Sequence, residues 1–173
     1  AVATAAGRYI GEEATLALAV ETVLAKRPGP VVVNCSTSRM TAAIAGRFGV
    51  PCHVSKVGEA NVVDEMLARG AVIGGEGNGG VIDPRVVLVR DSFIAMALIL
   101  ERLATERTTV EDLAAALPRM TMKKIKVDLS PGLRGPGLVD GLARIEAAFP
   151  EAAASRLDGL RLDWQDGWAR RCV

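Results

Sequence analysis

A stretch of alternating glycine and polar residues, Gly-Glu-Gly-Asn-Gly beginning at Gly75, is the part of the chain best suited to hold a ligand. Glu76 and Asn78 are two positions apart, so in an extended chain their side chains point the same way. A carboxylate accepts hydrogen bonds and an amide both donates and accepts them, which suits a ligand with adjacent hydroxyls, such as a sugar. Gly77 and Gly79 would let the backbone approach that ligand. The pattern favours a ligand loop, with a plain glycine hairpin as the alternative.

The same glycines also match the G-x-G-x-x-G pattern of dinucleotide-binding domains. In those domains the loop opens a helix, so that a phosphate meets the helix N-terminus. Here the loop is followed by Val81, Ile82, Asp83 and Pro84, which cannot begin a helix in that register. A nucleotide-binding domain is therefore the less favoured alternative.

A second polar segment, Lys56-Val57-Gly58-Glu59, follows an apolar run of strand type. It is either a solvated loop or a place where Lys56 reaches a phosphate or sugar oxygen.

A third polar segment runs from Ser36 through Thr37 and Ser38 to Arg39, between a predicted strand and a predicted helix. The favoured interpretation is N-capping of that helix by one of the hydroxyl side chains. The alternative is an anion site, in which free amides and Arg39 bind a phosphate.

These segments are positioned by an alternation of strands and helices. Hydrophobic patterning, caps and glycine stops predict strands at 30–36, 50–58 and 71–76, and helices at 14–27, 37–49, 59–70 and 90–106. Asp91 is predicted to cap the last of these helices, which its composition marks as strongly buried. Strand-helix-strand-helix-strand is a βαβαβ unit, an α/β fold with a largely parallel sheet flanked by helices. The three polar segments follow its strands, so they are expected at one edge of the sheet.

The residue pattern of the sequence changes after Arg107. The pattern predicts a helix at 108–120 capped by Thr109, an alternating strand at 121–130, a Pro/Gly loop at 131–137, a helix at 138–150 and a hairpin at 157–173. We therefore expect three parts. Residues 1–14 end a preceding domain, residues 15–107 form an α/β domain, and residues 108–173 begin an α+β domain that is not completed.

Composition excludes several classes of protein. The 173 residues carry 21 basic and 20 acidic side chains, a formal net charge of +1, so no strong field favours nucleic acid or a membrane surface. Aromatic residues make up 3%, too few for a base-stacking platform. The longest apolar run is far shorter than the ~20 residues that span a bilayer. Three cysteines without C-x-x-C spacing indicate a reducing, cytoplasmic location.

Three segments together resemble the third domain of the α-D-phosphohexomutases, the family of phosphomannomutase/phosphoglucomutase and phosphoglucosamine mutase. They are VVVNCSTSRMTAAIAGRFGVP, SKVGEANVVDEMLARGAVIGGEGNGGVI and RDSFIAMALILERLA. The family's sugar-recognition loop reads G-E-x-S-G-H or a glycine-rich variant, with Asn78 here in the serine position and Gly80 in the histidine position. The resemblance implies that Glu76 and Asn78 bind vicinal sugar hydroxyls. Lys56 to Gly58 matches a second loop, and Glu59 stands where many members have His or Asp.

The resemblance also implies the chemistry of a larger protein. Members have four domains, with a phosphoserine on the first, a Mg²⁺-binding D-x-D-x-D-R loop on the second and a phosphate-binding R-x-S-x-T loop on the fourth. None of these motifs occurs in the 173 residues, which resemble the end of domain two, all of domain three and the beginning of domain four.

The implied function is therefore the sugar-binding portion of a Mg²⁺-dependent mutase that interconverts hexose 1-phosphate and hexose 6-phosphate through a bisphosphorylated intermediate. Its expected partners are a hexose phosphate and the remaining domains, and the chain alone is expected to be inactive. The alternative is a non-catalytic sugar-phosphate-binding module of the same ancestry.

Overall fold

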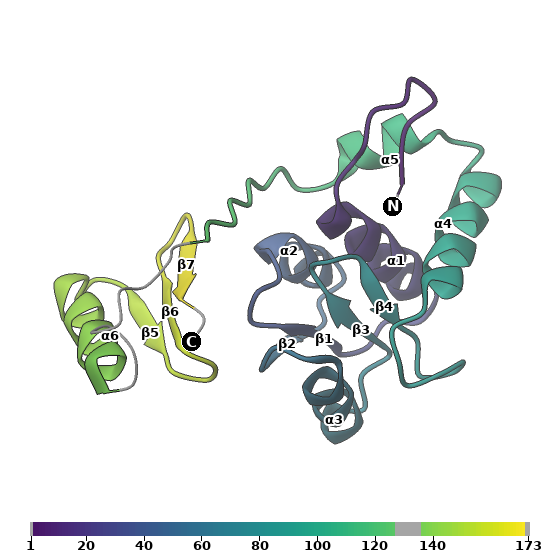
Figure 1. Ribbon diagram of the computed structural model, residues 1–173. Helices are drawn as coiled ribbons and strands as arrows, with labels where there is room; N and C mark the ends of the chain where they lie inside the picture. Colours follow the sequence, from purple (N-terminus) through teal and green to yellow (C-terminus); the bar gives the residue numbers. More distant parts are fainter. Residues whose placement is uncertain (1, 127–135, 172–173) are drawn as a thin grey trace. The chain divides into compact units, whose positions relative to one another are not determined.

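The computed structural model describes residues 2–126 and 136–171 (Figure 1). The chain divides into two compact units, Ala1–Thr121 and Met122–Val173, which are described separately. Within the described residues, no helix combines the length and the apolar composition that crossing a membrane requires.

The first unit is built on a four-stranded sheet in the order β2-β1-β3-β4. The strands are β1 (Val31–Asn34), β2 (Cys52–Ser55), β3 (Ile73–Glu76) and β4 (Gly80–Ile82). β1 pairs in parallel with both β2 and β3, and β4 returns antiparallel along β3. Helices α2 (Arg39–Arg47) and α3 (Glu59–Arg69) make the crossovers. The predicted βαβαβ unit is confirmed.

Helices cover both faces of this sheet, as Figure 1 shows. Val31 and Val33 pack in a large cluster with residues of α1 (Glu12–Lys26), α2 and α4 (Ser92–Glu106), whereas Val32 packs with Val62 and Met66 of α3. Because successive strand side chains point to opposite faces, the valine run of β1 serves both layers. α1 is the central helix of the larger layer, and its residues from Ala14 to Val20 are all buried.

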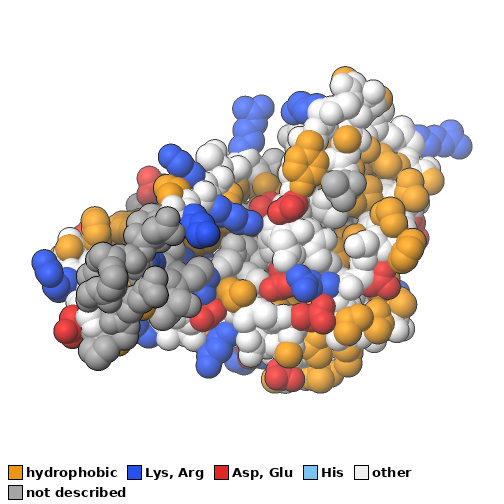
Figure 2. Space-filling model, viewed as in Figure 1, with side chains coloured by type: hydrophobic (Ala, Val, Ile, Leu, Met, Phe, Trp, Pro, Cys, Tyr) orange, Lys and Arg blue, Asp and Glu red, His pale blue; other side chains and the backbone are white. Residues whose placement is uncertain are grey.

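Helix α4 differs from its prediction. Asp91 does cap it, accepting hydrogen bonds from the amides of Phe93 and Ile94 at 2.7 and 3.2 Å. However, Phe93 is 78% exposed and Leu100 is 64% exposed, so only one side of α4 is in the core. Figure 2 shows hydrophobic side chains along the side of this unit where α4 lies. The apolar composition of this helix did not distinguish a fully buried helix from one with an exposed apolar face.

The first unit continues past the expected boundary at residue 107. Helix α5 (Val110–Ala116) is capped by Thr109, whose Oγ1 accepts a hydrogen bond from the Asp112 amide at 3.2 Å. Leu113 and Leu117 are buried in the same cluster as the leucines of α1. α5 therefore completes the α/β unit rather than opening the next one.

The second unit contains α6 (Pro136–Ala148) and an antiparallel sheet of β5 (Ala153–Ser155), β6 (Leu160–Asp163) and β7 (Trp168–Arg171). The predicted hairpin is confirmed, because β6 pairs with β7. β5 was not predicted. Leu142 of α6 packs with Leu160 and Leu162 of β6, and these three residues form the core of the second unit.

Two predictions near the start of the second unit differ from the structure at the residues that it describes. The strand predicted at 121–130 is wrong for residues 121–126, which adopt no strand, and residues 127–130 lie outside the described residues. Alternation without a neighbouring strand to complete the hydrogen-bond ladder does not make a strand. The loop predicted at 131–137 lies partly outside the described residues, and its last two residues begin α6.

Candidate functional site

The carboxyl ends of the three parallel strands are joined by one buried carboxylate. Glu76, the last residue of β3, accepts a hydrogen bond from Asn34 Nδ2 at the end of β1, at 2.6 Å. The same oxygen, Oε1, accepts the Gly58 amide, just after β2, at 3.3 Å. The predicted convergence of the three polar segments at one sheet edge is therefore confirmed.

Asn34 also organises the segment that follows β1. Its Oδ1 accepts hydrogen bonds from the Ser36 amide and from Thr37 Oγ1, both at 3.0 Å. Thr37 Oγ1 in turn accepts the Gly77 amide at 2.9 Å. A short buried network thus ties the beginning of α2 to the glycine loop.

The segment predicted as a possible anion site is occupied by the chain itself. The Thr37 amide donates to the Asn34 carbonyl at 3.0 Å, and the Ser38 amide donates to Glu13 Oε2 at 3.0 Å. Ser38 Oγ accepts the Met40 amide at 3.3 Å, which confirms the N-cap interpretation. With the amides of Ser36, Thr37 and Ser38 all bonded within the chain, these contacts argue against an anion site.

Glu76, which the sequence pattern predicts to bind a ligand, is buried and paired within the chain. It is 4% exposed, and its second oxygen, Oε2, lies 2.7 Å from Nη1 of Arg90. Arg90 also donates to Glu59 Oε2 from its backbone amide and from Nε, each at 2.9 Å. One guanidinium therefore bridges the carboxylate of Glu59, in the second polar segment, and that of Glu76, in the glycine loop.

This bridge shifts the ionisation of the exposed partners. The hydrogen bond from the Arg90 amide, followed by that from its side chain, lowers the pKa of Glu59. The hydrogen bond to Glu59 raises the pKa of Arg90. Both groups are charged at neutral pH, and their pairing holds the loop after β2 against the beginning of α4.

The glycines of the loop are explained mainly by the chain's own side chains. A β-carbon at Gly77 would collide with the Glu13 carboxylate, and one at Gly80 would collide with the side chain of Arg90. A β-carbon at Gly75 would collide with Leu16 of α1 and with the Gly80 carbonyl. Only Gly79, with a φ of +85°, is required for its backbone conformation, because left-handed backbone disfavours other residues. The close approach predicted for a ligand is made largely by protein groups.

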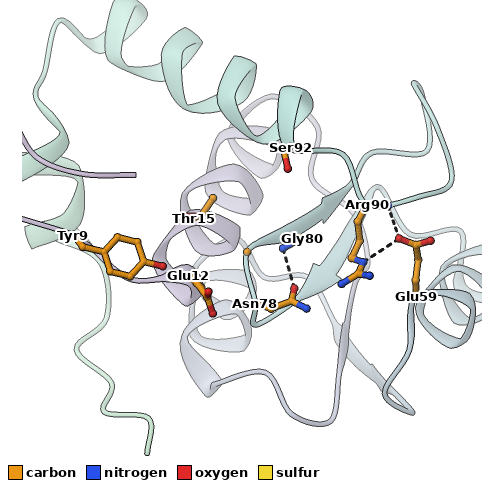
Figure 3. Close-up of a pocket in the computed structure, with 9 residues that line it drawn as sticks. Tyr9, Glu12, Thr15, Glu59, Asn78, Gly80, Arg90 and Ser92 are labelled. Carbon is orange, nitrogen blue, oxygen red and sulfur yellow. Dashed lines mark hydrogen bonds and ion pairs between the residues drawn. The ribbon is translucent and has the colours of Figure 1, made fainter. Parts of the chain in front are cut away.

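A pocket of about 450 Å³ opens on the outer side of this network (Figure 3). Its floor is the tip of the β3–β4 loop, where Asn78 Oδ1 accepts the Gly80 amide at 3.1 Å. The lining residues are Tyr9, Glu12, Thr15, Glu59, Asn78, Gly79, Gly80, Arg90 and Ser92. Figure 3 shows Tyr9 and Glu12 on one side of Asn78, and Arg90 and Glu59 on the other.

The predicted residues thus divide into two groups. Asn78, Gly79 and Glu59 line the pocket, whereas Glu76 and Gly58 lie in the supporting network and Lys56 is exposed outside the lining. Each lies where its strand end places it.

Sequence reasoning missed the pocket residues contributed by other elements. Tyr9, Glu12 and Thr15 come from the beginning of the chain and from α1, and Arg90 and Ser92 flank the cap of α4. The sequence did contain a signal for Arg90. A cation directly before a helix N-terminus is not favoured by the helix dipole, which indicates that it has another partner. No pattern pointed to Tyr9 or Thr15, because nothing in their neighbourhood indicates what they will face.

The described residues hold no group of three or more His, Cys, Asp or Glu side chains that could bind a metal ion.

Residues 12–120 match the model of the phosphoglucomutase/phosphomannomutase α/β/α domain III. The chain belongs to this family. A phosphoglucomutase/phosphomannomutase of Thermococcus kodakarensis is 32% identical over 163 residues, which cover 94% of this chain and 35% of the relative. A phosphoglucosamine/phosphogalactosamine mutase of Sulfurisphaera tokodaii is 28% identical over 138 residues, covering 80% of this chain and 30% of the relative. The chain thus spans about a third of the length of these relatives.

Solved structures of the family share the fold. A phosphoglucomutase/phosphomannomutase family protein of Burkholderia thailandensis superposes with a TM-score of 0.72 at 24% identity, over 95% of this chain and 35% of the other. A putative phosphomannomutase of Thermus thermophilus gives 0.68 at 17% identity, over 96% of this chain and 36% of the other. At these identities the likeness shows the fold alone.

The alternative of a dinucleotide-binding loop is contradicted by the hairpin. After Gly79 the chain enters β4, which pairs back onto β3 with Glu76 opposite Gly80. No helix begins at the loop, so the loop lacks the helix N-terminus that a pyrophosphate requires.

Proposed function

We propose that the 173 residues form the sugar-recognising part of a phosphohexomutase, which interconverts hexose 1-phosphates and hexose 6-phosphates. In this proposal the pocket over the β3–β4 loop receives the sugar ring. Asn78 supplies a hydrogen-bonding amide from the tip of the loop, and Glu59 supplies a carboxylate from the start of α3.

The observation that carries the proposal is the polarity of the pocket. Its lining offers hydroxyl, amide and carboxylate groups from Tyr9, Thr15, Asn78 and Glu59, which can satisfy the hydroxyls of a sugar. Arg90 is the only cation among the described lining residues, and it is already paired with two carboxylates. A phosphate therefore finds no uncommitted cation here, whereas a sugar ring finds several partners.

A pocket that binds the sugar ring rather than the phosphate suits a mutase. The 1- and 6-positions must take turns at the phosphoryl donor, so the sugar must bind in two opposite orientations. Hydroxyls near the middle of the ring can be held similarly in both. Phosphoryl transfer itself needs a nucleophile and cationic stabilisation. We assign the phosphoserine and Mg²⁺ of the proposal to other parts of the protein, and we expect no mutase activity from these 173 residues alone.

The proposal is tested by titrating the ¹⁵N-labelled chain with glucose 1-phosphate, mannose 1-phosphate and glucosamine 1-phosphate, with NAD as a control. Amide shifts are expected around Asn78, Gly79 and Glu59 with the sugar phosphates and not with NAD. Shifts centred instead on Ser36 to Arg39 would indicate an anion site and contradict the proposal.

Asn78→Ala sharpens this test, because it removes the amide at the tip of the loop. We expect at least roughly a threefold loss of affinity for every sugar phosphate, the equivalent of one hydrogen bond. Asn61→Ala is the matched control. Its amide donates to the nearby Val57 carbonyl at 2.8 Å and lies outside the pocket lining, so the variant should leave sugar binding unchanged.

A further inference from the structure

Two adjacent glutamates at the start of α1 have opposite surroundings. The Glu13 carboxylate accepts the Ser38 amide at 3.0 Å and fills the space above Gly77. The carboxylate of Glu12 is exposed and, among residues 2–126 and 136–171, makes no hydrogen bond or ion pair. The fold therefore uses Glu13 to hold the loops together and leaves Glu12 available in the pocket.

Glu12 is placed beside the sugar loop by its own backbone. A β-carbon at Gly79 would lie 3.5 Å from the Glu12 carbonyl oxygen and 3.7 Å from its Cβ, so helix and loop tip are in contact. Figure 3 shows the Glu12 carboxylate between Tyr9 and Asn78, with Thr15 one turn further along α1. Partial burial and the nearby Glu12 carboxylate raise the pKa of Tyr9.

The formal charge of the pocket is negative. Its lining contains two carboxylates, from Glu12 and Glu59, and one guanidinium, from Arg90. The guanidinium is shared between Glu59 and Glu76, so it does not offset Glu12 on the other side of Asn78. A positively charged group entering next to Glu12 would gain a charge-assisted hydrogen bond, which a neutral hydroxyl gains only in part.

We propose that Glu12 is a specificity-determining residue that binds a protonated amino group on the sugar, so that the pocket prefers hexosamine phosphates to neutral hexose phosphates. This inference rests on the proposed function, because it concerns the same pocket. The amine donates to the Glu12 carboxylate, while the ring hydroxyls keep their partners at Asn78 and Glu59.

The experiment compares two ligands that differ in one group. Binding of glucosamine 1-phosphate and glucose 1-phosphate to the 173-residue chain is measured by NMR titration at neutral pH and low salt. We expect the amino sugar to bind roughly three- to tenfold more tightly, as one partly exposed charge-assisted contact allows. The ratio should fall towards one in high salt, which screens the exposed charge.

Glu12→Gln keeps the shape of the side chain and removes its charge, and it should reduce the ratio of the two affinities to about one. Asp64→Asn on α3 is the matched control, since it removes one negative charge from outside the pocket lining and should keep the ratio. Because Glu12 is exposed, the variant chain is expected to fold, and its amide spectrum verifies this.

The outcomes are distinguishable. If the chain binds both sugars equally, or if Glu12→Gln leaves the ratio unchanged, the role of Glu12 is wrong and the proposed function stands. If the folded chain binds neither sugar phosphate, both the proposed function of this chain and the inference are wrong. A preference that is lost in Glu12→Gln and kept in Asp64→Asn supports the inference.

Discussion

The loop after β1 and the loop after β3 leave the same edge of the sheet, and both have the residue types of a binding site. In the first, Asn34 and Glu13 supply acceptors for the amides of Ser36, Thr37 and Ser38. In the second, the amides of Gly77, Gly79 and Gly80 are also bonded within the chain, but the side chain of Asn78 lies at the surface of a pocket. Convergence of polar residues is therefore a property of the fold, whereas availability depends on which of them the protein itself already uses.

The largest expected difference between the loops is in stability. Asn34→Ala removes the shorter of the two hydrogen bonds to the buried Glu76 Oε1 and the acceptor of the buried Thr37 hydroxyl, so we expect the free energy of unfolding to fall by about 2–3 kcal/mol. Asn78→Ala, in the open loop, should cost less than about 1 kcal/mol. Urea unfolding of both variants gives the comparison. Equal losses would mean that Asn78 stabilises the fold as much as Asn34 does.

A smaller loss is expected where the two loops touch. Gly77→Ala forces a methyl group against the Glu13 carboxylate and should cost about 1–2 kcal/mol, as overpacking does. In Glu13→Ala the carboxylate is gone, so adding Gly77→Ala to it should cost less than in the wild-type chain. A thermodynamic cycle on the four proteins measures the coupling. Strict additivity would show that Gly77 is required for its backbone rather than for space.

The loop after β1 should serve only as the N-terminal cap of α2. Ser38→Ala removes the acceptor for the Met40 amide and should cost about 1 kcal/mol of stability. Sugar-phosphate affinity should change by less than about twofold, because Ser38 does not line the pocket. A tenfold loss of affinity in the folded variant would restore the anion-site interpretation of this loop.

The smallest effect concerns pH. Hydrogen bonds from Arg90 hold the pKa of Glu59 below its ordinary value of 4.5. A lowered pKa in the folded state means that this pairing stabilises the fold above the ordinary pKa. The contribution is lost as the pH falls through the lowered value. NMR titration of the Glu59 carboxyl should give a midpoint below 4.5, and Arg90→Ala should raise it. A midpoint that does not move in the variant would exclude the Arg90 side chain and leave the backbone amide of residue 90, which the variant keeps, as the cause.

Sequence reasoning succeeded where local pattern determines structure. The valine run of β1 and the cap at Asp91 are each specified within a few residues, and strand order then places the loops at one edge. It could not give the direction of Glu76, because the partners that bury this side chain, Asn34 and Arg90, are distant in sequence. Glu12 was not predicted for the same reason. Its exposure, in contrast to the bonded carboxylate of Glu13, arises only when α1 packs against the loops.

The carboxylate of Glu76 also has a consequence for the order of folding. It bonds groups that follow β1 and β2, so its network closes only when all three parallel strands are paired. Pairing of strands that are far apart in the chain is slow, since loop-closure entropy is lost before the contacts form. The pocket should therefore be among the last features to appear during refolding, and recovery of sugar binding would then time the completion of the sheet.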